Sequence, residues 1–400
     1  MQSDPPRPPF TEWVRSSNNV TQQFLSLGQR PDVVSLAGGL PATELYPVDA
    51  VRRATMQALD RWGAAALEYG AVEGLPALRE LIAERTSIET GAHFGAANVL
   101  LTEGSMQGLD LLGKVLIDAG ERVVVQSPTY LGALDAWRPR RPAYQRLDWD
   151  ADAAQLRGAK FVYAVPNYSN PTGVLVPQAQ RVALLEQVRA AGTWLVEDDP
   201  YQPLQLDGPA GASILQHAAT HDGAAYSGPV IYLGTVSKSL APGLRVGWVI
   251  AEPGMIETLA LAKQGTDLSS SLLTQAITLE LLRERVDHEH GQAIVAAYRE
   301  RRDALCREAA LHLSEWFEWQ VPHGGMFVWM RAKNQAIDTN ELYRLALDED
   351  VAFVPSSVFD FAGVDRFAMR LNFTRASPQR LAEGVRRLAS ATRRYLRAAS

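Results

Sequence analysis

Two short β-type runs flank a lysine-bearing turn in the stretch Val230-Ile-Tyr-Leu-Gly-Thr-Val-Ser-Lys238-Ser-Leu-Ala-Pro-Gly-Leu-Arg245-Val-Gly-Trp-Val-Ile250. Further runs of this kind alternate with helical patterns upstream, at Asn98–Thr102, Arg122–Gln126, Lys160–Val165 and Thr193–Glu197. Short apolar strands separated by helices are typical of a sheet that is buried on both faces. We therefore expect an α/β fold with a mainly parallel central sheet flanked by helices.

A second alternation follows the first and predicts a smaller α+β domain. A long helix over Ser271–Leu313 leads to strands at Met326–Met330, Val351–Val354 and Phe367–Leu371. The N-terminal segment, with a helix over Thr11–Leu27, is expected to return to this smaller domain. The predicted division is an arm and part of the small domain over residues 1–50, a large domain over 51–290 and a small domain over 291–400.

Composition narrows the class of protein. A chain of 400 residues with 46% apolar and 21% charged residues can bury a large core. The net charge of −6 argues against nucleic acid or an anionic membrane as the main partner. The single Cys306 excludes an internal disulfide, and the sequence shows no signal-peptide core and no apolar run of transmembrane length. We expect a cytoplasmic protein.

Lys238 is the first candidate for chemistry. It is one of only five lysines in the chain, and it lies near the hydroxyls of Thr235 and Ser237 and seven residues before Arg245. A lysine amine can form a Schiff base with a phosphorylated aldehyde, while hydroxyls and a guanidinium hold the phosphate. An ordinary surface lysine is the alternative.

Other polar residues follow predicted strands, where ligands bind in open α/β sheets. Ser105 begins a predicted helix over Ser105–Ala119, and the free N–H groups of the first helical turn suit a phosphate. The alternative is that Ser105 only caps the helix. Asp198 could keep a heteroaromatic nitrogen protonated, and Tyr201 could bind a phenolic oxygen; an acidic turn is the alternative. Asn170, in Asn170-Pro-Thr-Gly173, and Tyr130 could face the ligand or only shape turns and packing.

Together these motifs resemble those of the fold-type I pyridoxal-phosphate enzymes, class I/II aminotransferases. The likeness extends from about residue 15 to the C-terminus and is greatest to the 2-aminoadipate and kynurenine aminotransferase-like branch. It implies pyridoxal 5'-phosphate as the cofactor, with Lys238 carrying it, Asp198 pairing with the pyridine nitrogen, and Tyr201 and Asn170 binding the 3-oxygen.

The resemblance also implies the remaining ligand contacts and a homodimer. It assigns Tyr130 to ring stacking, Arg370 to the substrate α-carboxylate and Gly39 to a place beside the substrate. Tyr69 matches a tyrosine that reaches the phosphate of the neighbouring subunit, which places the active sites at the subunit interface. The phosphate would be held by Ser105, the backbone amide of Met106, Ser237 and Arg245, with Thr235 as a further candidate.

The activity so implied transfers the amino group of an L-amino acid to a 2-oxo acid, 2-oxoglutarate being the expected acceptor, by a ping-pong mechanism through pyridoxamine phosphate. Aromatic, aliphatic or 2-aminoadipate-like donors are expected. Thr21 stands near the place where aminoadipate-type relatives often carry an arginine, so a preference for acidic side chains does not follow. A decarboxylase, racemase, lyase or synthase would share the same cofactor residues and stays an alternative.

Three other classes fit the sequence less well. A pyridoxal-phosphate-binding transcriptional regulator would need a DNA-binding domain, for which the roughly 30 residues before the Gly-Gly turn leave no room. A serine hydrolase would need a Gly-x-Ser-x-Gly elbow or a serine where Thr235 stands. No metal site is expected, because His288 and His290 are two apart on a predicted helix and point to different faces.

Overall fold

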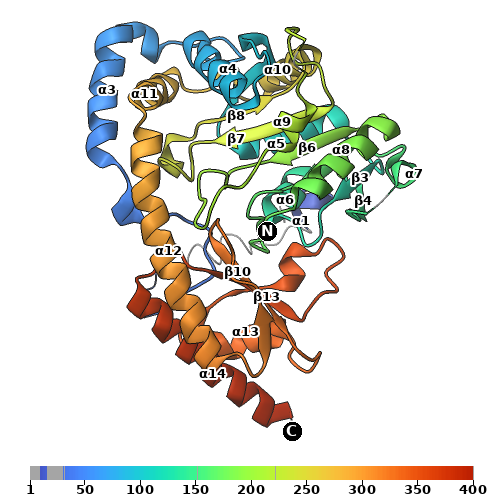
Figure 1. Cartoon of the computed structure of the whole chain (residues 1–400), viewed down its shortest axis with the longest axis vertical. Helices are drawn as coiled ribbons and strands as arrows, with labels where there is room; N and C mark the ends of the chain where they lie inside the picture. Colours follow the sequence, from blue (N-terminus) through green and yellow to red (C-terminus); the bar gives the residue numbers. More distant parts are fainter. Residues whose placement is uncertain (1–9, 16–29, 31, 151, 221, 400) are drawn as a thin grey trace, which may run out of the picture.

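The computed structural model describes residues 10–15, 30, 32–150, 152–220 and 222–399 (Figure 1). A seven-stranded sheet with helices on both faces forms the upper part of the molecule in this view, and a four-stranded sheet lies in the lower part. Most of the predicted helix over Thr11–Leu27 falls outside the described residues, which contain only α1 (Glu12–Arg15) from that segment.

The large sheet confirms the predicted α/β class. Its strand order is β2-β8-β7-β6-β5-β3-β4, and β8 alone in this sheet runs antiparallel to its neighbours. The edge strand β4 was not predicted, because its polar residues form no apolar run. The strands are β2 (Val99–Thr102), β3 (Arg122–Val125), β4 (Ala143–Arg146), β5 (Phe161–Ala164), β6 (Trp194–Asp198), β7 (Val230–Thr235) and β8 (Gly247–Ile250).

Helices on both faces of this sheet explain why its inner strands are almost entirely apolar. Val123 and Val125 belong to one buried hydrophobic cluster and Val124 to another, because successive side chains of a strand point to opposite faces. The helices of this part are α3 (Val48–Trp62), α4 (Pro76–Thr90), α5 (Ser105–Leu116), α6 (Leu131–Trp137), α7 (Ala153–Leu156), α8 (Gln178–Ala191), α9 (Ile214–Ala218) and α10 (Pro253–Asp267).

The second sheet is antiparallel, in the order β12-β13-β10-β9. A separate short pair joins β1 (Val34–Ser35) to β11 (Val351–Ala352) in parallel, so the N-terminal segment does return to the C-terminal part. The predicted strand over Val351–Val354 is therefore divided between two sheets. The bounds are β9 (Phe317–Trp319), β10 (Phe327–Ala332), β12 (Val354–Pro355), β13 (Ala368–Asn372), α13 (Thr339–Asp348) and α14 (Pro378–Ala399).

The predicted helix over Ser271–Leu313 is wrong in one respect. It is two helices, α11 (Leu272–Arg283) and α12 (Val286–His312). Arg285 lies between them with φ 56°, and this left-handed residue interrupts the helical hydrogen-bond ladder. Neither Gly nor Pro marks the break. The second helix descends from the large sheet to the small one, where it packs along α14 (Figure 1).

Candidate active site

A cavity of about 470 Å³ lies at the carboxyl ends of the large sheet's strands, next to β13 of the small sheet. Its walls bring together every predicted ligand-binding residue except Tyr69, although these residues are spread over 332 positions of sequence. They are Gly39, Ser105, Met106, Tyr130, Asn170, Asp198, Tyr201, Thr235, Ser237, Lys238, Arg245 and Arg370.

Lys238 enters this cavity from the turn that follows β7. Its Nζ donates a hydrogen bond to the carbonyl oxygen of Gly39 at 2.9 Å. Desolvation lowers the pKa of Lys238 to about 8, and the nearby guanidinium groups of Arg370 and Arg245 act in the same direction. The amine therefore carries its proton much less firmly than a surface lysine does.

Groups of a kind that could hold a phosphate lie where α5 begins. Helix α5 starts at Ser105 and presents its N-terminal amides toward the cavity, while Thr235 Oγ1 donates to Ser237 Oγ at 2.9 Å. Arg245 Nη2 donates to the carbonyl oxygen of Glu103 at 2.9 Å. Gly104 has φ 73°, and a Cβ there would lie 2.5 Å from Arg245 Nη2. A glycine is thus required for the guanidinium to reach the start of the helix.

Asp198 supplies a buried acceptor with one free oxygen. Its side chain is 2% exposed, and Oδ2 accepts a hydrogen bond from the Tyr163 hydroxyl at 2.7 Å. Oδ1 has no hydrogen-bond partner among the described residues. Desolvation raises the pKa of Asp198 to about 6, against the lowering effect of the Tyr163 hydrogen bond. An unpartnered carboxylate oxygen in a cavity fits a cationic N–H donor, such as a protonated pyridine nitrogen.

Arg370 reaches the cavity from β13 in the small sheet. Nη1 donates to Asn170 Oδ1 at 2.7 Å and Nη2 to the carbonyl oxygen of Ala37 at 2.6 Å, while Nε has no partner among the described residues. The guanidinium carbon lies 4.2 Å from the centroid of the Phe327 ring and 4.8 Å from that of Phe359. Desolvation lowers the pKa of Arg370 to about 10, which still leaves it charged at neutral pH.

Two tyrosines complete the polar lining. The Tyr130 hydroxyl lies 3.5 Å from the sulfur of Met106. Desolvation raises the pKa of Tyr130 to about 12, and desolvation is also the main cause of the raised pKa of Tyr201. Both phenols therefore remain protonated and can donate hydrogen bonds to a ligand.

Tyr69 lies elsewhere. Its side chain is 76% exposed and does not line the cavity of its own chain. The next residue is bound to the loop between α10 and α11, because the Gly70 amide donates to Ser269 Oγ at 3.3 Å. This arrangement leaves the phenol available to another molecule, and its role toward a neighbouring subunit stays a prediction.

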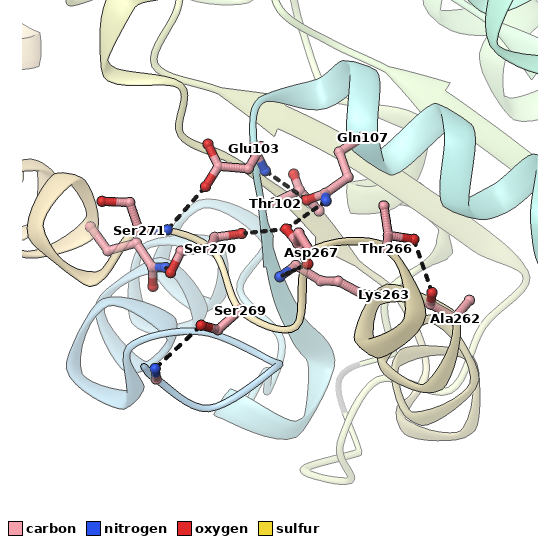
Figure 2. Close-up of polar contacts among 12 residues, drawn as sticks. Thr102, Glu103, Gln107, Ala262, Lys263, Thr266, Asp267, Ser269, Ser270 and Ser271 are labelled. Carbon is pink, nitrogen blue, oxygen red and sulfur yellow. Dashed lines mark hydrogen bonds and ion pairs between the residues drawn. The ribbon is translucent and has the colours of Figure 1, made fainter. Parts of the chain in front are cut away.

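Hydrogen bonds join the end of α10 and the loop after it, which contains Ser269 and Ser271, to the start of α5 (Figure 2). Asp267 ends α10 and is held within that helix by Lys263, whose Nζ lies 3.1 Å from Oδ1; its Oδ2 accepts a hydrogen bond from Gln107 Nε2 of α5 at 2.7 Å. The Ser271 amide donates to Glu103 Oε1 at 3.0 Å. The start of α5 and the loop after α10 are thereby parts of one hydrogen-bonded unit.

Sequence reasoning missed Tyr163, Phe327 and Phe359. Tyr163 and Phe327 lie in apolar runs that already predict strands, and Phe359 lies in a short turn after another, so nothing local distinguishes them from core. Tyr163 meets Asp198 only because β5 and β6 are neighbours in the sheet.

The described residues provide neither a metal site nor a helix suited to span a membrane. Within them, no three His, Cys, Asp or Glu side chains come together in a way that could bind a metal ion. None of the helices in that part of the chain is both long and apolar enough to cross a bilayer.

Comparison with known proteins adds an independent line of support. The model of the family "Aminotransferase class I and II" matches residues 31–388. The chain is 36% identical to the 2-aminoadipate transaminase of Thermus thermophilus, over 96% of both chains. It is 35% identical to aromatic-amino-acid aminotransferase 1 of Thermococcus litoralis, over 92% of this chain and 90% of the relative.

Solved structures agree with the fold. LysN, the α-aminoadipate aminotransferase of Thermus thermophilus, superimposes with a TM-score of 0.87 at 35% identity, over 97% of this chain and 98% of LysN. That structure is complexed with N-(5'-phosphopyridoxyl)-L-leucine. The family match and the fit of the cavity confirm the predicted cofactor, pyridoxal phosphate, and the predicted fold-type I architecture. The chain belongs to the class I and II aminotransferases and is a pyridoxal-phosphate-dependent transaminase.

Proposed function

We propose that this enzyme transfers the amino group of an L-amino acid with an apolar side chain to a 2-oxo acid, with 2-oxoglutarate as the acceptor, in a ping-pong cycle. The observation that carries the proposal is the convergence of Lys238, Asp198 and Arg370 on one cavity. An amine, an anion for a ring nitrogen and a guanidinium for a carboxylate are the groups that amino-acid chemistry on this cofactor needs.

In this proposal each cofactor contact has a named residue. Ser105, the amide of Met106, Ser237 and Arg245 hold the phosphate, with Thr235 supporting Ser237. Asp198 pairs with the ring nitrogen, Tyr201 and Asn170 bind the 3-oxygen, and Tyr130 stacks on the ring. Tyr69 of the partner subunit adds to the phosphate site, in a cytoplasmic homodimer.

Arg370 binds and orients the amino acid. Its planar fork can hold both oxygens of an α-carboxylate, and Phe327 and Phe359 keep the guanidinium in place from the sides. Its present acceptors, Asn170 Oδ1 and the Ala37 carbonyl, would share the fork with the substrate. Gly39 lies beside this position and leaves room for the substrate backbone.

Lys238 is the residue that moves the proton. With a pKa of about 8, roughly one amine in ten is neutral at pH 7 and able to accept a proton from the substrate Cα. The bound cofactor supplies the conjugated ring that accepts the electron pair left on Cα, and Asp198 stabilises the positive charge on its nitrogen. The positive charges of Arg370 and Arg245 further lower the pKa of Lys238.

The walls around the substrate position support an apolar donor. Among the described residues, the cations lining the cavity are Lys238, Arg245 and Arg370, and the proposal gives each a role. The remaining wall is mainly apolar, as expected for aromatic or aliphatic side chains, with Leu40, Leu131, Val354, Val358 and Phe359. Thr21, which bears on 2-aminoadipate as a donor, lies outside the described residues.

A half-reaction tests the proposal. The purified holoenzyme is mixed with single L-amino acids without an oxo-acid acceptor, while cofactor absorbance and released products are followed. We expect stoichiometric conversion to the pyridoxamine form with one equivalent of the matching 2-oxo acid, fastest for aromatic or branched aliphatic donors. Accumulation of ammonia, carbon dioxide or the D-enantiomer instead would exclude transamination while leaving the cofactor site intact.

A further inference from the structure

Tyr163 is a buried phenol that the proposed mechanism does not use. It lies on β5 with no solvent exposure, and its hydroxyl donates to Asp198 Oδ2 at 2.7 Å. The other oxygen of the same carboxylate, Oδ1, is the one left without a partner among the described residues. A single hydrogen bond therefore divides the two oxygens into one that is held and one that is free.

The ring of Tyr163 is itself held in place. Trp137 packs its edge against it, with centroids 5.2 Å apart and an interplanar angle of 85°. Trp137 is in turn fixed because its Nε1 donates to the carbonyl oxygen of Leu109 at 2.8 Å. Gly113 on α5 makes room for it, since a Cβ at that position would lie 2.6 Å from Trp137 Cδ1.

We propose that Tyr163 is a positioning residue that holds Asp198 with one oxygen turned to the ring nitrogen of the cofactor. The inference rests on the proposed function, in which Asp198 pairs with that nitrogen. The hydroxyl has two effects on the carboxylate. It restricts rotation, so that the free oxygen stays directed into the cavity, and it favours the ionised form in a site where burial disfavours charge.

The donor is permanent. Desolvation, followed by the charge of Asp198, raises the pKa of Tyr163 well above that of an exposed tyrosine. The phenol is therefore protonated throughout the neutral pH range, where it donates its hydrogen bond to the carboxylate.

The test compares two cofactors that differ at one ring atom. The full-length chain, stripped of cofactor, is titrated with pyridoxal phosphate and with its 1-deaza analogue, in which a C–H replaces the ring nitrogen. We expect Tyr163→Phe to weaken pyridoxal phosphate about tenfold, the value of roughly one hydrogen bond to a charged group, and to change affinity for the analogue by less than about twofold. The phenylalanine ring keeps the packing against Trp137, and the thermal midpoint checks the fold.

The matched control is Tyr168→Phe. Tyr168 is equally buried, but its hydroxyl has no partner among the described residues, so its removal should leave both affinities unchanged. Equal weakening of both cofactors by Tyr163→Phe would show a packing role and overturn the proposal, and so would no weakening of either.

The variant Asp198→Asn distinguishes a failure of the role of Tyr163 from a failure of the proposed contact between Asp198 and the ring nitrogen. If Asp198 meets the ring nitrogen, this variant weakens pyridoxal phosphate selectively, and adding Tyr163→Phe to it has no further selective effect. Loss of selectivity in Asp198→Asn itself would contradict the proposed nitrogen contact. Selectivity in Asp198→Asn but not in Tyr163→Phe would contradict only the role of Tyr163.

Discussion

The large sheet borders two cavities, one at the carboxyl ends of its strands and one on a face, and the two differ in kind. The second, of about 510 Å³, lies between α4, the start of α12 and the face of β7 that carries Tyr232. Its one arginine, Arg85, is already paired with Asp287 at 2.7 Å. The smaller cavity instead holds one amine and two guanidinium groups, of Lys238, Arg245 and Arg370, and none of them forms an ion pair within the described residues. Convergent unpaired groups, rather than volume, distinguish the candidate active site.

Neighbouring residues of β6 and the segment after it show the same contrast. Asp198 faces the first cavity and Asp199 the second, because side chains alternate along an extended chain. Both are buried, and both have one oxygen without a partner among the described residues. The comparison therefore predicts large effects of substitution on one face and small effects on the other.

The largest effect is expected from Lys238→Ala. Removal of the amine leaves no base at the substrate Cα, and turnover should fall by at least about 10³-fold. Steady-state rates with a fast donor and 2-oxoglutarate measure this. Partial rescue by added ethylamine would support loss of the base rather than of the fold, whereas activity within tenfold of the wild type would remove Lys238 from the mechanism.

A smaller loss is expected from Arg370→Lys. The lysine keeps the charge but cannot hold both carboxylate oxygens, so kcat/KM should fall about 10- to 100-fold, mainly through a higher KM. Arg85→Lys in the second cavity is the matched control and should stay within about twofold, since it alters only an ion pair with Asp287. Equal effects of the two substitutions on kcat/KM would contradict the assignment of the active site to the cavity that contains Arg370.

The smallest effect on catalysis is expected from Asp199→Asn, which should keep kcat within about twofold. Its consequence should lie in stability. Burial raises the pKa of Asp199 to about 8, above its unfolded value of about 3.9, so the folded state holds an extra proton between these values. The free energy of unfolding of the wild type therefore falls as the pH rises from about 4 to 8, because the buried carboxyl group must give up its proton. The asparagine variant has no such proton and lacks this decrease.

Thermal midpoints at pH 5 and pH 8 measure the difference. The gap between the variant and the wild type should move in favour of Asp199→Asn at the higher pH. A gap that does not change with pH would mean that Asp199 is not protonated in the folded protein at pH 5 to 8.

Local chemistry made much of the site predictable. Lys238 stands in a turn with hydroxyls, and Asp198 ends a run of apolar residues, because binding groups in this fold occupy strand ends. Both of these assignments depend only on residues that are close in the sequence. The resemblance to a family added Arg370 and Gly39 to the predicted site. The alternating apolar runs likewise predicted a buried, mainly parallel sheet, while the polar edge strand β4 and the break at Arg285 carry no local signal.

Contacts between distant segments could not be predicted in this way. The bond from Tyr163 to Asp198 depends on which strands are neighbours, and the stacking of Phe327 and Phe359 on Arg370 depends on how the small sheet meets the large one. Such contacts join residues without any fixed spacing in the chain. The order of residues thus specified which groups this enzyme carries, and the packing of its sheets established which of them are held and which stay free for a ligand.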